Sequence, residues 1–129
     1  MKESPLFVKS FEMLTWLLDH TRKFPKHQRF VMAKRMEEAA LGFHDEILWA
    51  VKSPEGRGAA LGRADYHLER LKVYNRLAVK LELESFGQYE HLARMLDELG
   101  RLLGGWIRKA GVSRGAASGV ASAPGASPG

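Results

Sequence analysis

The sequence has 129 residues and no cysteine, and its 20 lysines and arginines against 15 aspartates and glutamates give a formal charge of +5. This length predicts one domain whose core is large enough to fold without a disulfide or a metal ion. Without cysteine the chain has no thiolate zinc site, no iron–sulfur cluster and no cysteine nucleophile. Apolar residues are dispersed among charges, so we expect no membrane span, no signal peptide and a cytoplasmic protein.

Two zones differ in composition. Residues 1–110 are rich in Leu, Glu, Lys, Arg and Ala with a helical period, which predicts a folded domain. Residues 111–129 consist mainly of Gly, Ala, Ser and Pro with one charge, Arg114, which predicts a flexible tail that buries too little surface to offset its ordering entropy. The net positive charge is compatible with a nucleic acid, an acidic protein or an anionic membrane surface as partner.

The first half of the folded zone predicts two helices. One begins at Ser4, an N-cap residue followed by Pro5, and ends at Phe24-Pro25, because the residue before a proline disfavours helical backbone. The other runs from about residue 26 to 52 and ends at the Pro- and Gly-containing segment 53–58. Their expected core stripes are Phe7, Phe11, Leu14 and Leu18 in the first and Phe30, Ala33, Ala40, Ile47 and Val51 in the second.

The second half predicts two further helices, over about 59–84 and 86–110. Between them, Ser85 and Gln88 have the spacing of a capping box, which marks a tight turn. The expected stripes are Ala64, Leu68, Leu71, Ala78 and Leu81 in the third helix and Tyr89, Leu92, Leu96, Leu99, Leu103 and Trp106 in the fourth. No segment has a sustained period of two, so the sequence predicts an all-α, antiparallel up-down-up-down four-helix bundle.

A four-helix bundle raises the question of a di-iron site, which needs Glu-x-x-His on two helices. No histidine has a glutamate three residues before it and no two histidines are four apart, so we predict neither a metal site nor a cofactor. His44-Asp45-Glu46 fits a solvated polar cluster better than a ligand set. Without a nucleophile elbow or a P-loop, the sequence favours a binding protein over an enzyme or a metal carrier.

Basic residues gather in two places. The first lies between His20 and Arg35, a stretch without any acid, and comprises Arg22, Lys23, Lys26, Arg29, Lys34 and Arg35. The second is a ridge at four-residue spacing on the third helix, formed by Lys72, Arg76 and Lys80. Both are interpreted as phosphate-contacting surfaces, with a merely solvated loop or face as the alternative.

The fourth helix carries a third basic feature, an arginine every seven residues, at positions 94, 101 and 108. This stripe lies opposite the apolar stripe and is expected to face outward, where Asp97 and Glu98 are placed to neutralise part of it. The aromatic residues available for stacking on bases are Tyr66, Tyr74 and Phe86, and core packing is expected for each. Binding is therefore expected to run through phosphates, with low sequence specificity and strong salt dependence.

A pair of adjacent glycines, Gly104-Gly105, interrupts the apolar stripe of the fourth helix. Each costs roughly 1 kcal/mol of helix stability relative to alanine. We therefore expect a packing reason for them, namely the close approach of another backbone.

Residues 71–109 closely resemble the Avd-like four-helix bundle proteins, which comprise the accessory variability determinant of diversity-generating retroelements and proteins encoded in intervening sequences of ribosomal RNA genes. The resemblance rests on ELGRLLGGWI at 98–107, on Gln88-Tyr89-Glu90, and on the basic pair Lys72 and Arg76, one turn apart. Lysine stands at 72 where arginine is usual in the family, so a bidentate phosphate contact would be lost there.

This resemblance implies a homopentameric barrel with a basic surface and no catalytic activity. It also implies a protein that binds a reverse transcriptase and template RNA and supports mutagenic cDNA synthesis. The residues expected to bind nucleic acid or the reverse transcriptase are Lys72, Arg76, Lys80, Arg22, Lys23, Lys26, Arg29 and Arg101. The alternative is a structural or protein-interaction oligomer of the intervening-sequence type whose basic surface binds an acidic protein.

Overall fold

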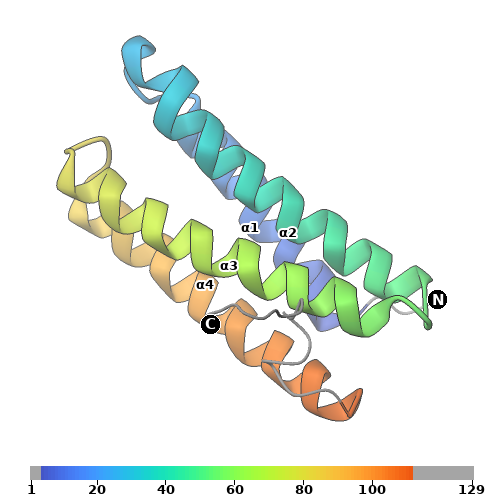
Figure 1. The fold of residues 1–129 in the computed structure, drawn as a ribbon. Coiled ribbons are helices and arrows are strands. Elements are labelled where there is room, and N and C mark those ends of the chain that lie inside the picture. Colours follow the sequence, from blue (N-terminus) through green and yellow to red (C-terminus); the bar gives the residue numbers. More distant parts are fainter. Residues whose placement is uncertain (1–3, 112–129) are drawn as a thin grey trace, which may run out of the picture.

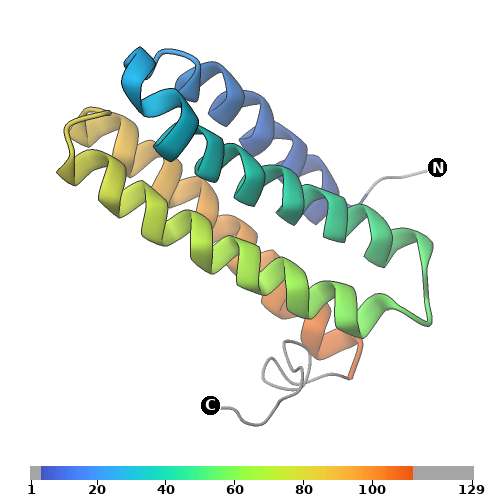
Figure 2. The ribbon, with the colours of Figure 1, turned by 45° about the horizontal axis from the view of Figure 1, so that its top comes forward.

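The computed structural model describes residues 4–111, which contain four α-helices and no strand. They are α1 (Pro5–Thr21), α2 (Lys34–Lys52), α3 (Arg57–Lys80) and α4 (Phe86–Lys109), with a 3₁₀ turn (Lys26–Gln28) and a π-helical turn (Arg29–Ala33) before α2. Successive helices are antiparallel, and α4 closes the bundle by packing on α1 (Figures 1 and 2). The predicted up-down-up-down four-helix bundle is confirmed, whereas the tail predicted over 111–129 lies, beyond Gly111, outside the described residues.

Helix ends follow the local capping signals of the sequence. The Phe7 N–H donates to Ser4 Oγ (3.1 Å) at the start of α1, where Pro5 takes the first helical position. At the start of α4, the Gln88 N–H donates to Ser85 Oγ (3.0 Å) and the Ser85 N–H donates to Gln88 Oε1 (2.8 Å). This reciprocal capping box satisfies backbone donors that the first turn of a helix leaves unpaired. Both predicted starts are therefore confirmed.

The core is aliphatic, and the stripes predicted for the second half supply much of it. Those buried as predicted are Ala64, Leu68, Leu71 and Ala78 of α3 and Leu92, Leu96, Leu99 and Leu103 of α4. From the second predicted helix, Ala33, Ala40 and Ile47 are also buried. Trp106 and Tyr74 are partly buried and pack against this cluster.

The stripe predicted for α1 is confirmed for Leu14, which is buried, and for Phe7, which packs against the core, but it is wrong for Phe11 and Leu18. Phe11 is 58% exposed and Leu18 is exposed, whereas Leu6, Met13 and Leu17 are buried. Because α1 is apolar on two faces, its periodicity fits either face as the core side. The buried face also carries Ser10, whose hydroxyl lies 2.9 Å from His44 Nδ1 on α2, so a small residue stands where α1 and α2 approach each other.

The connection from α1 to α2 differs from the continuous helix predicted from residue 26. α1 ends at Thr21, and the chain continues through the 3₁₀ and π-helical turns before regular α2 begins at Lys34. Proline disfavours helical backbone at the residue before it, so the Phe24-Pro25 step separates α1 from the 3₁₀ turn that begins at Lys26. The irregular turns leave Phe30 83% exposed, and Val51 at the other end of α2 is also exposed, so neither belongs to the core.

α3 begins two residues earlier than predicted, at Arg57, and ends four residues earlier, at Lys80. Leu81 caps the helix and is exposed, contrary to its predicted place in the core. Glu82 then has φ 62°, a left-handed conformation that turns the chain toward α4. The reversal thus begins before the Ser85 cap that marks the next helix.

Of the two glycines predicted to pack closely, Gly104 is buried, whereas Gly105 is only partly buried. A Cβ on Gly105 would meet Arg108 Nη2 at 3.9 Å, an ordinary contact, so the expected close backbone approach is wrong there within this chain. A Cβ on Gly42 of α2 would instead lie 2.9 Å from the imidazole of His67 on α3. Burial, with help from the neighbouring Arg70, lowers the pKa of His67. The neutral ring accepts a hydrogen bond from Arg70 Nη1 at its Nδ1 (2.9 Å), which holds it against Gly42.

We expect the effect of Gly42→Ala on the free energy of unfolding to have opposite signs with histidine and with alanine at position 67. Alanine raises helix stability by about 0.5–1 kcal/mol over glycine, but here its methyl group collides with the His67 ring. Gly42→Ala should therefore destabilise the wild-type chain and stabilise a His67→Ala chain, as measured by urea unfolding. Gly87→Ala is the control, because a Cβ there would meet only Ser85 Oγ, at an ordinary contact distance of 3.9 Å. Equal effects of Gly42→Ala in both backgrounds would contradict the prediction.

Candidate nucleic-acid interface

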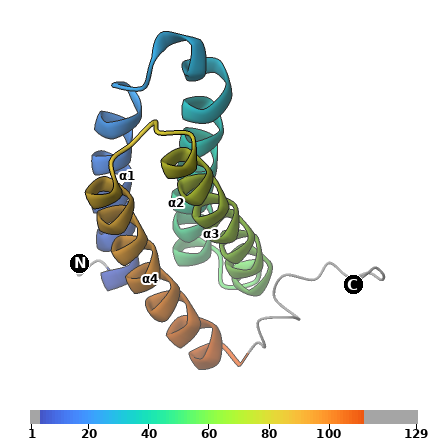
Figure 3. The same ribbon diagram turned by 90° about the vertical axis from the view of Figure 1, so that its left-hand side faces the viewer.

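The first basic cluster forms the α1–α2 turn, defined here as residues 22–35, which projects past the α3–α4 turn at one end of the bundle (Figure 3). Lys26, Arg29, Lys34 and Arg35 are all exposed there. Within residues 4–111, none of these four cations forms an ion pair with an acid. Unpaired, solvated cations of this kind are available to phosphate groups.

Two further cations of this turn, Arg22 and Lys23, form ion pairs with an acidic residue that lies just outside the acid-free stretch of sequence. Arg22 Nη2 lies 2.8 Å from Asp19 Oδ1, and Lys23 Nζ lies 3.3 Å from Asp19 Oδ2. Hydrogen bonds from Arg22 and Lys23 lower the pKa of Asp19, so it stays ionised and offsets their charge. The interpretation of the whole cluster as uncompensated is therefore corrected, and Lys26, Arg29, Lys34 and Arg35 are its cations without an acidic partner in the described chain.

The α3 ridge keeps its predicted spacing but is uneven in exposure. Lys72 is half-buried, and its Nζ lies 3.7 Å from Glu69 Oε2 and 3.8 Å from the position that a Cβ on Gly100 of α4 would take. Arg76 and Lys80 are exposed and have no ion pair in the described part of the chain. With a rise of 1.5 Å per residue, the ridge from Lys72 to Lys80 is about 12 Å long.

The arginine stripe of α4 faces solvent, as predicted, with residues 94, 101 and 108 all exposed. The expected neutralisation by Asp97 and Glu98 is wrong, because neither acid pairs with these arginines within residues 4–111. Glu98 Oε2 lies instead 3.9 Å from Lys9 Nζ on α1. Arg101 thus remains a solvated cation next to Gly100, the residue over which Lys72 lies.

The fold does not bring all eight predicted site residues together. α1 and α3 both run toward the end that carries the α1–α2 turn, so Lys80, the last residue of α3, lies at that end (Figure 1). Arg101 lies 15 residues into α4, about 22 Å along the helix from this end. The predicted residues therefore form an end group with Lys80 and a lateral group of Lys72, Arg76 and Arg101.

Aromatic side chains are more exposed than the sequence analysis expected. Tyr66 is 61% exposed and Phe86 is 65% exposed, so the prediction of core packing is wrong for both. The guanidinium of Arg70 lies 5.7 Å from the ring centroids of both Tyr66 and Tyr74, within the range of a cation–π contact. Sequence reasoning missed this ladder, although its four-residue spacing places the three side chains on one helix face.

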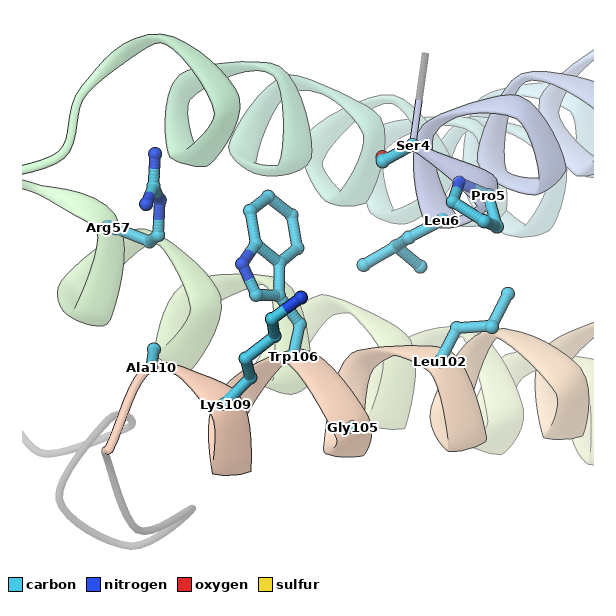
Figure 4. Close-up of a pocket in the computed structure, with 9 residues that line it drawn as sticks. All are labelled: Ser4, Pro5, Leu6, Arg57, Leu102, Gly105, Trp106, Lys109 and Ala110. Atoms are coloured by element: carbon cyan, nitrogen blue, oxygen red, sulfur yellow. The ribbon is translucent and has the colours of Figure 1, made fainter. Parts of the chain in front are cut away.

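A pocket of about 610 Å³ opens at the other end of the bundle, between the start of α1 and the end of α4. Figure 4 shows the Trp106 indole standing between Arg57 of α3 and Leu6 of α1. Arg57 Cζ lies 5.7 Å from the indole centroid, and its Nε donates to the Ala50 carbonyl (2.8 Å), which fixes the guanidinium at the rim. With Lys109 also lining it, the pocket suits an apolar group that carries negative charge.

The described residues contain no group of three or more histidine, aspartate or glutamate side chains placed to hold a metal ion. Separately, none of the helices described is long and apolar enough to cross a membrane.

Fold and surface together define a small basic four-helix bundle with solvated cations gathered at the α1–α2 turn and along α3, and further exposed cations on α4. A family model described as bAvd-like matches residues 6–110, and the chain belongs to this family of Avd-like four-helix bundle accessory proteins. A comparison with curated proteins finds no match. The match confirms the resemblance carried by residues 71–109 and extends it over the two helices that have no distinctive motif.

Proposed function

We propose that this chain is a non-catalytic accessory protein of a diversity-generating retroelement that binds the reverse transcriptase and template RNA and supports mutagenic cDNA synthesis. The observation that carries the proposal is the bAvd-like match over residues 6–110. The bundle itself offers exposed cations for phosphate contact. Such a protein works in the cytoplasm by holding two macromolecules together.

The distribution of charge supports binding through the nucleic-acid backbone. Arg76, Lys80 and Arg101 are exposed and without ion pairs in the described chain, and Lys72 completes the lateral group. Cations spaced along a surface neutralise successive phosphates and release counterions, whatever the base sequence. RNA and DNA are then both ligands, and affinity falls steeply with salt.

Outward-facing apolar side chains support the proposed homopentamer. Three helices carry such stripes at helical spacing: Val8, Phe11 and Leu18 on α1, Leu41, Leu48 and Trp49 on α2, and Tyr66, Val73 and Leu77 on α3. Contiguous apolar surface of this kind is typical of protein–protein contacts. A ring of five protomers buries some of these stripes at every interface while leaving the cations of the end group in solvent.

The double variant Lys72→Glu/Arg76→Glu tests the nucleic-acid role. We expect affinity for RNA at low salt to fall at least tenfold, because two phosphate contacts become repulsive, and the salt slope to decrease by about one per lost contact. Fluorescence anisotropy across a salt series measures both. Both positions are on the surface of α3, so the helical circular dichroism signal and the thermal midpoint should change little.

A matched control reverses two exposed cations outside the proposed surface, Lys52 and Lys109, near the opposite end of the bundle. This control variant has the same net charge as Lys72→Glu/Arg76→Glu and should bind RNA much more tightly than that variant does. Unchanged affinity of Lys72→Glu/Arg76→Glu at low salt would remove the assignment.

The second candidate is an interaction oligomer that binds an acidic protein, favoured by apolar stripes and basic groups on one molecule. Co-purification with a co-expressed retroelement reverse transcriptase, lost in Lys72→Glu/Arg76→Glu, supports the first function. A partner retained after nuclease treatment, together with absent RNA affinity, supports the second. Genomic position beside a template/variable repeat pair or inside a ribosomal RNA gene gives an independent distinction.

A further inference from the structure

Phe30 is the most exposed of the large hydrophobic side chains in the described residues, at 83%. It is the second residue of the π-helical turn that leads into α2, at the projecting end of the bundle (Figure 3). Full burial of a phenylalanine side chain stabilises a protein substantially, and exposed Phe30 does not contribute this stabilisation to the fold. π-helical insertions in helices recur at functional sites.

The chain on either side of Phe30 is anchored, so the ring is presented by a structured turn. Phe24 is buried on one side, and Met32 and Ala33 are buried on the other. Arg29 Nε donates to the Phe24 carbonyl (3.4 Å), a contact that links the two ends of the segment 24–29. An aromatic side chain held this way loses little conformational freedom when it binds a ligand.

The surroundings of Phe30 are basic. Lys26, Arg29, Lys34 and Arg35 are exposed around it and form no ion pair in the described chain. No acidic residue occurs between His20 and Arg35. This combination fits a polyanion that also offers a flat apolar face.

A single-stranded nucleic acid has both properties, because its phosphates carry the charge and its unpaired bases expose their faces. A membrane surface fits less well. Stable interfacial anchoring needs an extended apolar helix face, whereas the exposed large apolar side chains of this turn, in the described structure, are Phe30 and Val31 alone.

We propose that Phe30 stacks on an unpaired base of a single-stranded RNA or DNA, while Lys26 and Arg29 contact the phosphates beside it. The inference rests on the proposed nucleic-acid function and adds to it a selectivity for single strands. In a duplex the bases face each other and only the phosphates reach this turn. The cations therefore contribute to binding of both single strands and duplexes, whereas the Phe30 ring contributes only to binding of single strands.

Fluorescence anisotropy with an unstructured single strand and with the duplex of the same sequence tests the proposal. Phe30→Leu keeps the charge and an apolar side chain but removes the stacking face. We expect single-strand affinity to fall by about 5- to 100-fold, with the duplex affinity and the salt slope unchanged. Phe30→Trp retains an aromatic ring and should retain single-strand affinity. Binding of this variant should also quench the fluorescence of a 2-aminopurine base in the strand, because the ring stacks on that base.

Phe86→Leu is the matched control. Phe86 is also exposed at this end of the bundle, but it follows the α3–α4 turn, where the exposed charges of Lys80 and Glu82 have opposite signs, instead of the acid-free cations of the α1–α2 turn. We expect this variant to bind both nucleic acids as the wild type does. Lys26→Glu/Arg29→Glu, in contrast, should weaken both and lower the salt slope.

The outcomes separate the inference from the function on which it rests. If wild-type protein binds neither nucleic acid at low salt, both fail. If it binds and Phe30→Leu binds equally well, or loses duplex and single strand alike, only the stacking role fails. Phe30→Leu that keeps single-strand affinity but loses sedimentation with phosphatidylserine vesicles, or loses oligomer mass in light scattering, overturns the proposal in favour of a membrane or a protomer contact.

Discussion

Replacing His20 with alanine is expected to destabilise the bundle by about 1–3 kcal/mol, the cost of leaving one partner of a buried hydrogen bond unsatisfied. His20 Nε2 lies 2.7 Å from Glu84 Oε1, with both side chains almost fully buried. The pair joins the end of α1 to the α3–α4 turn. Without His20, the Glu84 carboxyl group remains buried with no side chain to bind it.

The environment of the pair explains why the effect should be large. The Trp16 indole stacks on the His20 ring with 4.5 Å between the ring centroids, and Phe24 forms an edge contact with the same ring at 5.3 Å. Glu84 Oε2 already has no hydrogen-bond partner within the described residues. In such apolar surroundings a polar group cannot recover its lost hydrogen bond from bulk water, so its desolvation remains uncompensated.

Urea unfolding measures this prediction against two comparisons. Asp19→Ala removes the exposed partner of Arg22 and Lys23 and should change the midpoint little, since solvent screens that contact. His20→Leu/Glu84→Leu replaces both buried partners with apolar groups and should recover most of the loss. Equal unfolding midpoints for His20→Ala and Asp19→Ala would show that burial gives the pair no special weight.

Helix positions were predictable where one pattern dominated. α4 has a single apolar stripe and a capping box, and its burial and its start follow the sequence. α1 has two apolar faces, and choosing between them required knowing that Ser10 meets His44 across the α1–α2 contact. That contact joins residues 34 positions apart, so local periodicity holds no information about it.

The basic surface was predictable in composition but not in pairing. Asp19 stands just outside the acid-free stretch, yet one helical turn brings it to Arg22 and Lys23. Phe30 shares a helical spacing with Ala33 and Ala40, which predicts a core residue. The 3₁₀ and π-helical turns after Pro25 change that register and turn the ring into solvent, an outcome decided by backbone geometry rather than by hydrophobic pattern.

Substituting Val73→Glu/Leu77→Glu on α3 is expected to dissociate the proposed homopentamer into protomers. Both side chains are exposed in the chain and lie on one face, four residues apart. In a closed ring every interface carries the same substitutions, so each one exchanges two buried apolar groups for two carboxylates that lack partners. Burying a valine or leucine contributes about 1.5–3 kcal/mol, and burying an unpaired charge costs more than that contribution.

Light scattering coupled to size exclusion gives the mass of each variant. Val73→Ile/Leu77→Met keeps the face apolar and should keep the wild-type mass, while helical circular dichroism should be unchanged in both variants because neither side chain belongs to the protomer core. A wild-type mass for Val73→Glu/Leu77→Glu would place assembly on the α1 or α2 stripe. A wild-type protein with the mass of a single chain would contradict the pentamer, and the apolar stripes would then be surfaces for the reverse transcriptase.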